Sequence, residues 1–280
     1  MAKAPSGRVI AVTGGARGIG RAIAEKLAAG GALVAIGDRD HEGARNTAAE
    51  IPGTARGFAC DVTDNASFGA FLEAVETWAG PVDVLVNNAG VMWVGEFDEE
   101  PESAAELQLA VNLHGVIRGV KLAAPAMRAR GRGHIVTVAS ATSKLSPPGE
   151  ATYAATKHGV HGYLTGVRAE LRSSGVALSA VMPAVVDTEL AAGTGTGAAK
   201  LLAPADVAEA VAAVVRRPRF EVTVPRHLGP LLRWVNLLPQ RGRDFVLRLV
   251  VPNQVTAAGD KKAREDYETR TLADSADNSA

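Results

Sequence analysis

Residues 13–20 read TGGARGIG, and they follow directly on the apolar run VIAVT at residues 9–13. A glycine-rich loop is informative in this context, because a strand before it and a helix after it form the unit that binds dinucleotides. Gly14, Gly18 and Gly20 permit a tight turn and a close approach to the backbone. The free N–H groups at the start of the following helix would then face a pyrophosphate. The stretch therefore predicts a dinucleotide-binding unit at the beginning of the chain.

The rest of the chain continues this alternation of short apolar runs with stretches rich in Ala, Leu and Glu. The expected strands are Val9 to Thr13, Leu33 to Gly37, Arg56 to Cys60, Val82 to Val86, His134 to Val138, Leu178 to Met182 and Val222 to Val224. The expected helices are Gly18 to Ala29, His41 to Glu50, Ser67 to Ala79, Ser103 to Arg130, Thr152 to Ser173 and Pro204 to Arg216. Regular alternation predicts an α/β fold with a Rossmann-type, doubly wound parallel sheet of about seven strands and helices on both faces.

We expect three segments along the chain. Residues 1–225 would form a single dinucleotide-binding catalytic domain, and residues 226–258 an amphipathic extension. Residues 259–280 are polar and mixed in charge, which is typical of a flexible tail.

Composition excludes several classes of function. Thirty basic residues balance thirty acidic ones, so no overall field favours nucleic acid. The beginning of the chain lacks the apolar segment of a signal peptide, and no apolar run is long enough to span a membrane. The single cysteine, Cys60, forms no internal disulfide and suits a reducing compartment, so a cytoplasmic location is expected. The six histidines form no cluster at metal-ligand spacing, and no metal is expected.

Asp38 is the main indicator of cofactor choice. It lies 18 residues after Gly20, at the end of the second expected strand, where a carboxylate can accept both ribose hydroxyls of an adenosine. The same carboxylate would repel a 2′-phosphate, whereas Arg17 and Arg39 could attract one. Because Asp38 occupies the ribose position itself, we expect NAD in preference to NADP.

Six motifs in order then resemble the short-chain dehydrogenase/reductase family over about residues 8 to 225. They are TGxxxGxG from Thr13, Asp61 in CDVTD, NNAG at residues 87–90, Asn112, Ser140, and YAATK at residues 153–157. The resemblance implies a nicotinamide-dependent oxidoreductase that forms a homodimer or homotetramer. It also implies that Asp61 and Val62 contact adenine, and that Asn87, Ala89 and Gly90 line the dinucleotide cleft.

The glycine loop and the resemblance together give a full set of expected cofactor contacts. These are Gly14, Ala16, Arg17, Gly18, Ile19, Gly20, Asp38, Arg39, Asp61, Val62, Asn88, Ala89, Gly90, Tyr153, Lys157, Pro183, Val186 and Thr188. Val186 and Thr188 match the family's contacts to carboxamide and phosphate. The chain departs from the family at Ala184, where Gly usually follows Pro, and a Cβ there could narrow the floor near the nicotinamide.

The expected catalytic residues are Asn112, Ser140, Tyr153 and Lys157. Tyr153 and Lys157 are four residues apart, so on a helix they project from the same face. A neighbouring ammonium lowers the pKa of a phenol from its ordinary value near 10, which suits Tyr153 as a general acid/base. Ser140 can donate a hydrogen bond to the substrate oxygen as charge develops. The resemblance implies that Asn112 holds a water through which Lys157 exchanges protons with solvent.

These residues predict hydride transfer between a nicotinamide cofactor and a secondary alcohol or ketone. The alternative is a catalytically silent dinucleotide-binding sensor or scaffold, which would not require this acid/base set. Two other enzyme classes fit less well. A sugar-nucleotide epimerase usually has TGxxGxxG, and an enoyl reductase usually separates Tyr from Lys by six residues.

The substrate pocket is expected to have apolar walls. The candidate walls are Val91 to Phe97, Ala141 to Glu150 and Ala184 to Leu202, with Met92, Trp93, Val94, Leu145, Val185 and Leu190 as apolar surfaces. Residues 191–200 have the composition of a closing lid. For a homodimer, Leu109, Val116, Val160 and Leu164 are candidate contacts, with a core role equally open.

The extension is expected to form two amphipathic helices separated by Pro239. Its apolar residues recur at helical spacing from Leu228 to Val250. They could pack on the domain as a pocket wall or an oligomer contact. Alternatively, five arginines and Trp234 could place the helices on a membrane surface. Both alternatives favour a lipophilic alcohol or ketone as substrate.

Overall fold

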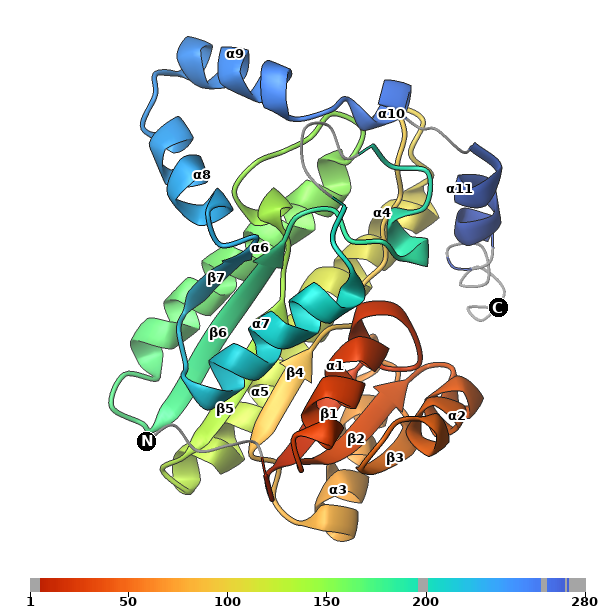
Figure 1. Ribbon diagram of the computed structural model, residues 1–280, viewed down its shortest axis with the longest axis vertical. Coiled ribbons are helices and arrows are strands. Elements are labelled where there is room, and N and C mark those ends of the chain that lie inside the picture. Colours follow the sequence, from red (N-terminus) through yellow and green to blue (C-terminus); the bar gives the residue numbers. More distant parts are fainter. Residues whose placement is uncertain (1–5, 196–200, 258–260, 270, 272–280) are drawn as a thin grey trace.

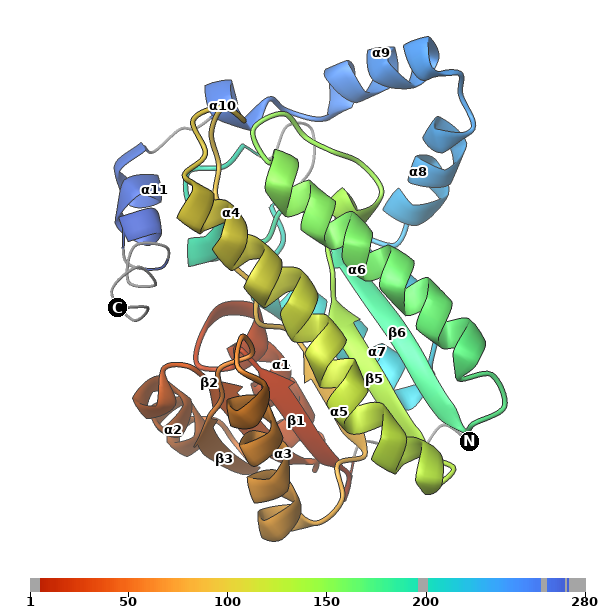
Figure 2. The ribbon, with the colours of Figure 1, turned by 180° about the vertical axis from the view of Figure 1, so that it is seen from behind.

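The computed structural model describes residues 6–195, 201–257, 261–269 and 271. Within these residues, seven parallel strands form one sheet in the order β3-β2-β1-β4-β5-β6-β7 (Figures 1 and 2). The strands are β1 (Val9–Thr13), β2 (Leu33–Asp38), β3 (Thr54–Ala59), β4 (Val84–Asn87), β5 (Gly133–Val138), β6 (Val176–Pro183) and β7 (Glu221–Val224). The predicted doubly wound parallel sheet is confirmed.

Helices cover both faces of this sheet. They are α1 (Gly18–Ala29), α2 (His41–Glu50), α3 (Asn65–Ala79), α4 (Glu102–Gln108), α5 (Gly115–Ala129), α6 (Ala151–Glu170) and α7 (Pro204–Arg216). One hydrophobic cluster joins the sheet to α1, α2 and α7 (Figure 1), and a second joins it to α3, α5 and α6 (Figure 2). All strands are parallel, so the loops that follow them meet at the same edge of the sheet.

The position of each strand in the sheet explains how clearly the sequence reveals it. β1 and β4 lie in the centre, every residue in them is buried, and both read as continuous apolar runs. β3 lies at an edge, and each of its residues is exposed or half-buried. An edge strand therefore accommodates Arg56 and Gly57.

The single helix expected from Ser103 to Arg130 contains a change of pitch. α4 and α5 are joined by a π-helical turn, Leu109–His114, in which Asn112 is fully buried. Such turns often occur at functional sites, because the extra residue redirects a side chain.

Three of the four residues suggested as dimer contacts lie in the core of the monomer. Val116, Val160 and Leu164 belong to the second hydrophobic cluster, and only Leu109 is exposed. Of the two roles open for these residues, the structure therefore shows the core role for Val116, Val160 and Leu164, and the interface role stays a prediction for Leu109 alone. A homo-oligomer stays a prediction.

The chain continues after β7 as a helical extension, as expected. Its helices are α8 (Leu228–Asn236), α9 (Gln240–Val250), α10 (Gln254–Ala257) and α11 (Lys261–Glu268). Here α11 differs from the loose tail expected from residue 259, because Arg264 and Tyr267 are buried against the domain. The described helices include none with the length and apolarity needed to cross a bilayer.

Candidate active site

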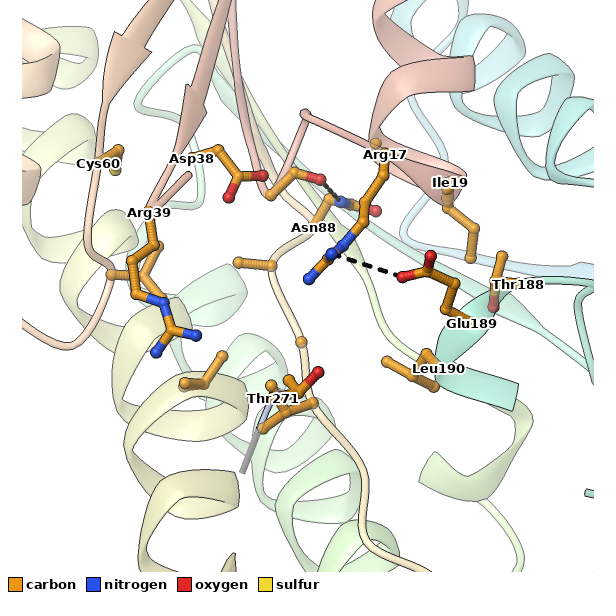
Figure 3. Close-up of a pocket in the computed structure, with 18 of the residues that line it drawn as sticks. Arg17, Ile19, Asp38, Arg39, Cys60, Asn88, Thr188, Glu189, Leu190 and Thr271 are labelled. Carbon is orange, nitrogen blue, oxygen red and sulfur yellow. Dashed lines mark hydrogen bonds and ion pairs between the residues drawn. The ribbon is translucent and has the colours of Figure 1, made fainter. Parts of the chain in front are cut away.

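A cavity of about 520 Å³ opens at the carboxyl ends of β1, β2 and β4 (Figure 3). Its walls are Gly14, Arg17, Gly18, Ile19, Gly20, Asp38, Arg39, Cys60, Asp61, Val62, Thr63, Asn88, Ala89, Gly90, Val91, Leu107, Val111, Thr188, Glu189, Leu190, Tyr267 and Thr271. Most of the expected cofactor residues are therefore brought together around one space.

The glycine loop has the backbone geometry that its sequence predicted. Gly14 and Gly18 have φ values of +64° and +56°, which side chains rarely adopt. At Gly20 a Cβ would lie 2.0 Å from the carbonyl oxygen of Gly14, so only glycine fits. Among the described residues no side chain caps the amino end of α1, which leaves its N–H groups available to an anion.

Asn88 fixes this loop to the end of β4. Its Nδ2 donates to the carbonyl oxygens of Thr13 at 3.0 Å and Gly14 at 2.9 Å. Asn87, by contrast, is buried beside Gly119 and is not part of the cavity wall. The amide of the NNAG motif that reaches the cleft is thus Asn88.

Asp38 lies at the cavity wall and also supports the loop. One carboxylate oxygen accepts from the N–H of Ala16 at 3.0 Å, and the other from the N–H of Asp40 at 3.1 Å. The two neighbouring arginines differ in their surroundings (Figure 3). Arg17 forms an ion pair with Glu189 across the cavity at 3.5 Å, whereas Arg39 lies on the same side as Asp38.

Five expected cofactor residues lie outside the cavity wall, namely Tyr153 and Lys157, described below, and Ala16, Pro183 and Val186. Ala16 contributes its N–H to Asp38, and Val186 pairs with Leu202 in an isolated parallel bridge. Pro183 ends β6 in the core. The side chain of Ala184 packs against the first hydrophobic cluster and is not part of the wall either. The closing lid expected at 191–200 lies partly outside the described residues, which resume at 201.

Tyr153 and Lys157 lie one turn apart on α6, beyond the cavity wall and shielded from solvent. They are 8% and 5% exposed, although an exposed Lys is the usual state for that residue. The Lys157 ammonium is 5.3 Å from the centre of the Tyr153 ring. Ser140, at the end of β5, forms a hydrogen bond with the Tyr153 side chain. These three side chains therefore converge on one point.

Burial is the main cause of the pKa shifts of Tyr153 and Lys157. It raises the pKa of Tyr153 well above its ordinary value, and the charge of Glu150 adds to this while the hydrogen bond with Ser140 lowers it. Burial also lowers the pKa of Lys157 to about 8. The pKa of Tyr153 is thus raised and not lowered as expected from Lys157, because removal from water disfavours the charged form of both groups.

Asn112 ties the π-helical turn to the loop after β4. Its Oδ1 accepts from the N–H of Val91 at 2.9 Å, and its Nδ2 donates to the carbonyl oxygen of Val91 at 2.8 Å. A Cβ on Gly90 would lie 3.3 Å from Oδ1 of Asn112 and 3.8 Å from Nζ of Lys157. A side chain at Gly90 would therefore lie against both of these polar groups.

The sequence assigned no part in the chemistry to three residues near this group, although Glu150 ends one of the expected pocket walls. Glu150 is buried one turn before Tyr153, and burial raises the pKa of its carboxyl to about 7, against the opposing charge of Arg264. Arg264 donates to the carbonyl oxygens of Leu190, at 2.9 Å, and Met92. The Tyr267 hydroxyl accepts from the N–H of Met92 at 3.3 Å. No motif marks Arg264 or Tyr267, because both lie beyond the family resemblance.

Comparisons with known proteins agree with this arrangement. The sequence profile of the short chain dehydrogenase family matches residues 8–198. The "probable oxidoreductase EphD" of Mycobacterium tuberculosis is 37% identical over 191 residues, which are 67% of this chain and 32% of that protein. This chain thus covers about a third of the length of the first curated relatives it matches.

Two solved structures extend the comparison. A metagenomic short-chain oxidoreductase in complex with NADP is 35% identical, with a TM-score of 0.69, and the match covers 79% of this chain and 97% of that one. A short-chain dehydrogenase/reductase from Burkholderia phymatum in complex with NAD is 27% identical, with a TM-score of 0.76, and covers 84% and 94%. These similar proteins hold one or the other form of the dinucleotide.

Proposed function

The chain belongs to the short-chain dehydrogenase family, and on this premise we propose that it transfers a hydride between NAD and a secondary alcohol or ketone. The observation that carries the proposal is the convergence of Ser140, Tyr153 and Lys157 in a buried group beside a glycine-loop cavity. A protein that only bound a dinucleotide would not require a phenol, a hydroxyl and an ammonium at one point.

The residues at the cavity fit a nicotinamide dinucleotide. Gly14, Gly18 and the uncapped amino end of α1 would hold the pyrophosphate, and Asp38 the adenosine ribose. When bound, the nicotinamide ring supplies the hydride acceptor or donor. Asp38 and the ion pair of Arg17 with Glu189 both favour NAD over NADP, because a 2′-phosphate would meet one carboxylate and compete with another for Arg17.

We assign the proton chemistry to Tyr153. During oxidation its Oη takes the proton of the substrate hydroxyl, and during reduction it returns a proton to the carbonyl oxygen. Ser140 donates to the same substrate oxygen as charge develops. Lys157 holds its ammonium against the Tyr153 ring, and Asn112 orders the loop above it. The positive charge of an oxidised nicotinamide would lower the pKa of the Tyr153 phenol from the raised value that burial gives it.

The substrate is proposed to be lipophilic. Val91, Leu107, Val111 and Leu190 contribute apolar side chains to the cavity wall. Such a surface favours a long-chain or polycyclic alcohol over a small polyol.

A panel of alcohols tests this proposal. Steroid, retinoid and fatty alcohols would be oxidised with NAD and with NADP, and each rate compared with that of the Tyr153→Phe variant. We expect NAD-dependent turnover of the larger alcohols that the variant lacks. Tight dinucleotide binding without turnover of any alcohol or ketone would instead favour the silent sensor.

A further inference from the structure

The helical extension carries most of the exposed large apolar side chains of the described chain. Nine large hydrophobic residues are exposed among those that the structure describes, and six of them lie between residues 231 and 249. They are Leu231, Trp234, Leu237, Leu238, Phe245 and Leu249. Single exposed apolar residues are normal, but a concentration of this kind marks an interaction surface. We call these six residues the apolar patch.

The apolar patch is held in place by the buried side of α8. Leu232 and Val235 are 4% and 7% exposed, and Thr223 in β7 accepts a hydrogen bond from the N–H of Gly229 at 2.9 Å. In contrast, Trp234 and Leu237 are 73% and 76% exposed. The helix is therefore anchored by one side while another side faces outward, and α9 extends from it at the edge of the molecule (Figures 1 and 2).

Basic residues accompany the apolar side chains on α9. Arg241, Phe245 and Leu249 are spaced four residues apart, and Arg248 lies three after Phe245, so these four share one side of the helix. All four are exposed. Residues 226–250 contain five arginines and a single acidic residue, Asp244, whereas the whole chain is neutral. The patch thus combines exposed apolar groups with a local excess of positive charge.

We propose that this surface docks on an anionic lipid bilayer, with α8 and α9 lying in the plane of the headgroups. Apolar side chains would enter the acyl boundary, the arginines would meet lipid phosphates, and Trp234 suits the interface between them. α9 has 11 residues and spans about 16 Å, too short for a hydrocarbon core of about 30 Å, so it lies on the surface.

The charge argues against a second copy of the chain as the occupant. A two-fold interface brings the same patch of both subunits together. Here that would place Arg241 and Arg248 of one copy near the same arginines of the other, with only Asp244 on α9 to offset them. An anionic bilayer supplies the opposite charge over the whole patch.

Flotation with lipid vesicles tests the proposal without using enzyme activity, so its result is separate from that for the proposed function. The full chain would be mixed with vesicles of phosphatidylcholine alone or with phosphatidylglycerol added. We expect flotation only with the anionic vesicles, weakened by salt. Arg241→Gln with Arg248→Gln should weaken binding about 30-fold, at about 1 kcal/mol for each arginine. Arg128→Gln with Arg172→Gln, which removes the same charge from exposed positions outside the extension, should leave vesicle binding unchanged.

A second measurement follows Trp234 directly. Anionic vesicles should shift its fluorescence to shorter wavelength, and Trp234→Phe should remove that shift while Trp78 and Trp93 remain. Equal flotation with neutral vesicles, or no effect of the Arg241 and Arg248 changes, would overturn the proposal. Self-association without lipid that Trp234→Ala abolishes would also overturn it, in favour of a second copy.

Discussion

Glu150 lies three residues before Tyr153 at the start of α6, and both side chains are buried. Burial is the main reason for the raised pKa of each group, and the charge of Glu150 further raises the pKa of Tyr153. A carboxyl that titrates near neutral pH is thus coupled to the proposed general acid/base. This coupling links the chemistry of the site to a residue that no family motif includes.

Replacement of the phenol tests the assigned acid/base. Tyr153→Phe removes the only transferable proton, so we expect turnover to fall by about 10²–10⁴-fold or more while the dissociation constant for dinucleotide stays nearly unchanged. Tyr163→Phe is the matched control, because Tyr163 lies on the same helix and is only half-buried. Lys157→Ala should impair both turnover and dinucleotide binding. Substantial oxidation by the Tyr153→Phe protein would contradict the assignment.

The rate of alcohol oxidation should rise with pH, since the phenolate is the base. Glu150→Gln removes a negative charge that raises the pKa of Tyr153. The rising limb of the pH profile should therefore move to lower pH in this variant. A profile that stays in place, measured with the same alcohol and saturating cofactor, would show that the two groups are not coupled in the complex.

Glu150 also makes the stability of the fold depend on pH. Its pKa is about 7 in the folded protein against an ordinary value of 4.5, so between these values only the folded protein retains the proton. Its contribution is full below about pH 4.5 and is lost as pH rises to about 7. At about 1.4 kcal/mol for each pH unit, the loss is roughly 3 kcal/mol. Urea unfolding at pH 5 and pH 8 should show that Glu150→Gln gains stability relative to the native chain at pH 8. If the free energy of unfolding of Glu150→Gln differs from that of the native chain by the same amount at pH 5 and pH 8, Glu150 does not titrate in this range.

Asp38 should determine the choice between the two dinucleotides. Asp38→Asn removes the charge that would repel a 2′-phosphate and leaves an amide at the ribose position. We expect the ratio of the NADP to the NAD dissociation constant to fall about tenfold or more, equivalent to about 1.4 kcal/mol. Asp40→Asn is the control, since Asn also caps α2 and the residue does not line the cavity. NADP binding tenfold tighter than NAD in the unchanged chain would refute the assignment.

Arg264 should stabilise the loops at the mouth of the site. Arg264→Ala leaves the buried carbonyl oxygen of Met92 and the partly buried one of Leu190 without this donor, which costs about 1–3 kcal/mol. We expect the substitution to lower the free energy of unfolding. It should also raise KM for long-chain or polycyclic alcohols more than KM for small alcohols. Arg172→Ala, at an exposed position, should change neither quantity. If the folded Arg264→Ala protein has the same KM values as the native chain for large and small alcohols, α11 does not contribute to substrate binding.

The sequence predicts the sheet well because its central strands are buried on both faces. β1 and β4 must be apolar throughout, and Gly20 cannot carry a side chain against the Gly14 carbonyl. Those parts of the site that depend on the spacing of residues along one helix were equally predictable, as for Tyr153 and Lys157 on α6. These are local relationships, which the order of residues records directly.

Contacts between distant segments could not be predicted in this way. Val160 and Leu164 look alike whether their side of α6 meets the sheet or a partner, and only the packing shows that it meets the sheet. Arg264 and Tyr267 lie in a polar stretch, and their burial depends on Met92 and Leu190, far away in the chain. Periodicity carries no information about such pairings.

The walls of the cavity come from both ends of the described chain, from Gly14 near the beginning and from Tyr267 and Thr271 near the end. During synthesis, the strands β1 to β7 can all leave the ribosome before residue 267 is made, and amino-terminal parts fold first. A newly made chain would then hold a finished sheet and an open cavity for the time needed to add the extension. The last wall of the site is also the last to be translated, so translational pauses within the extension would prolong the lifetime of the open form.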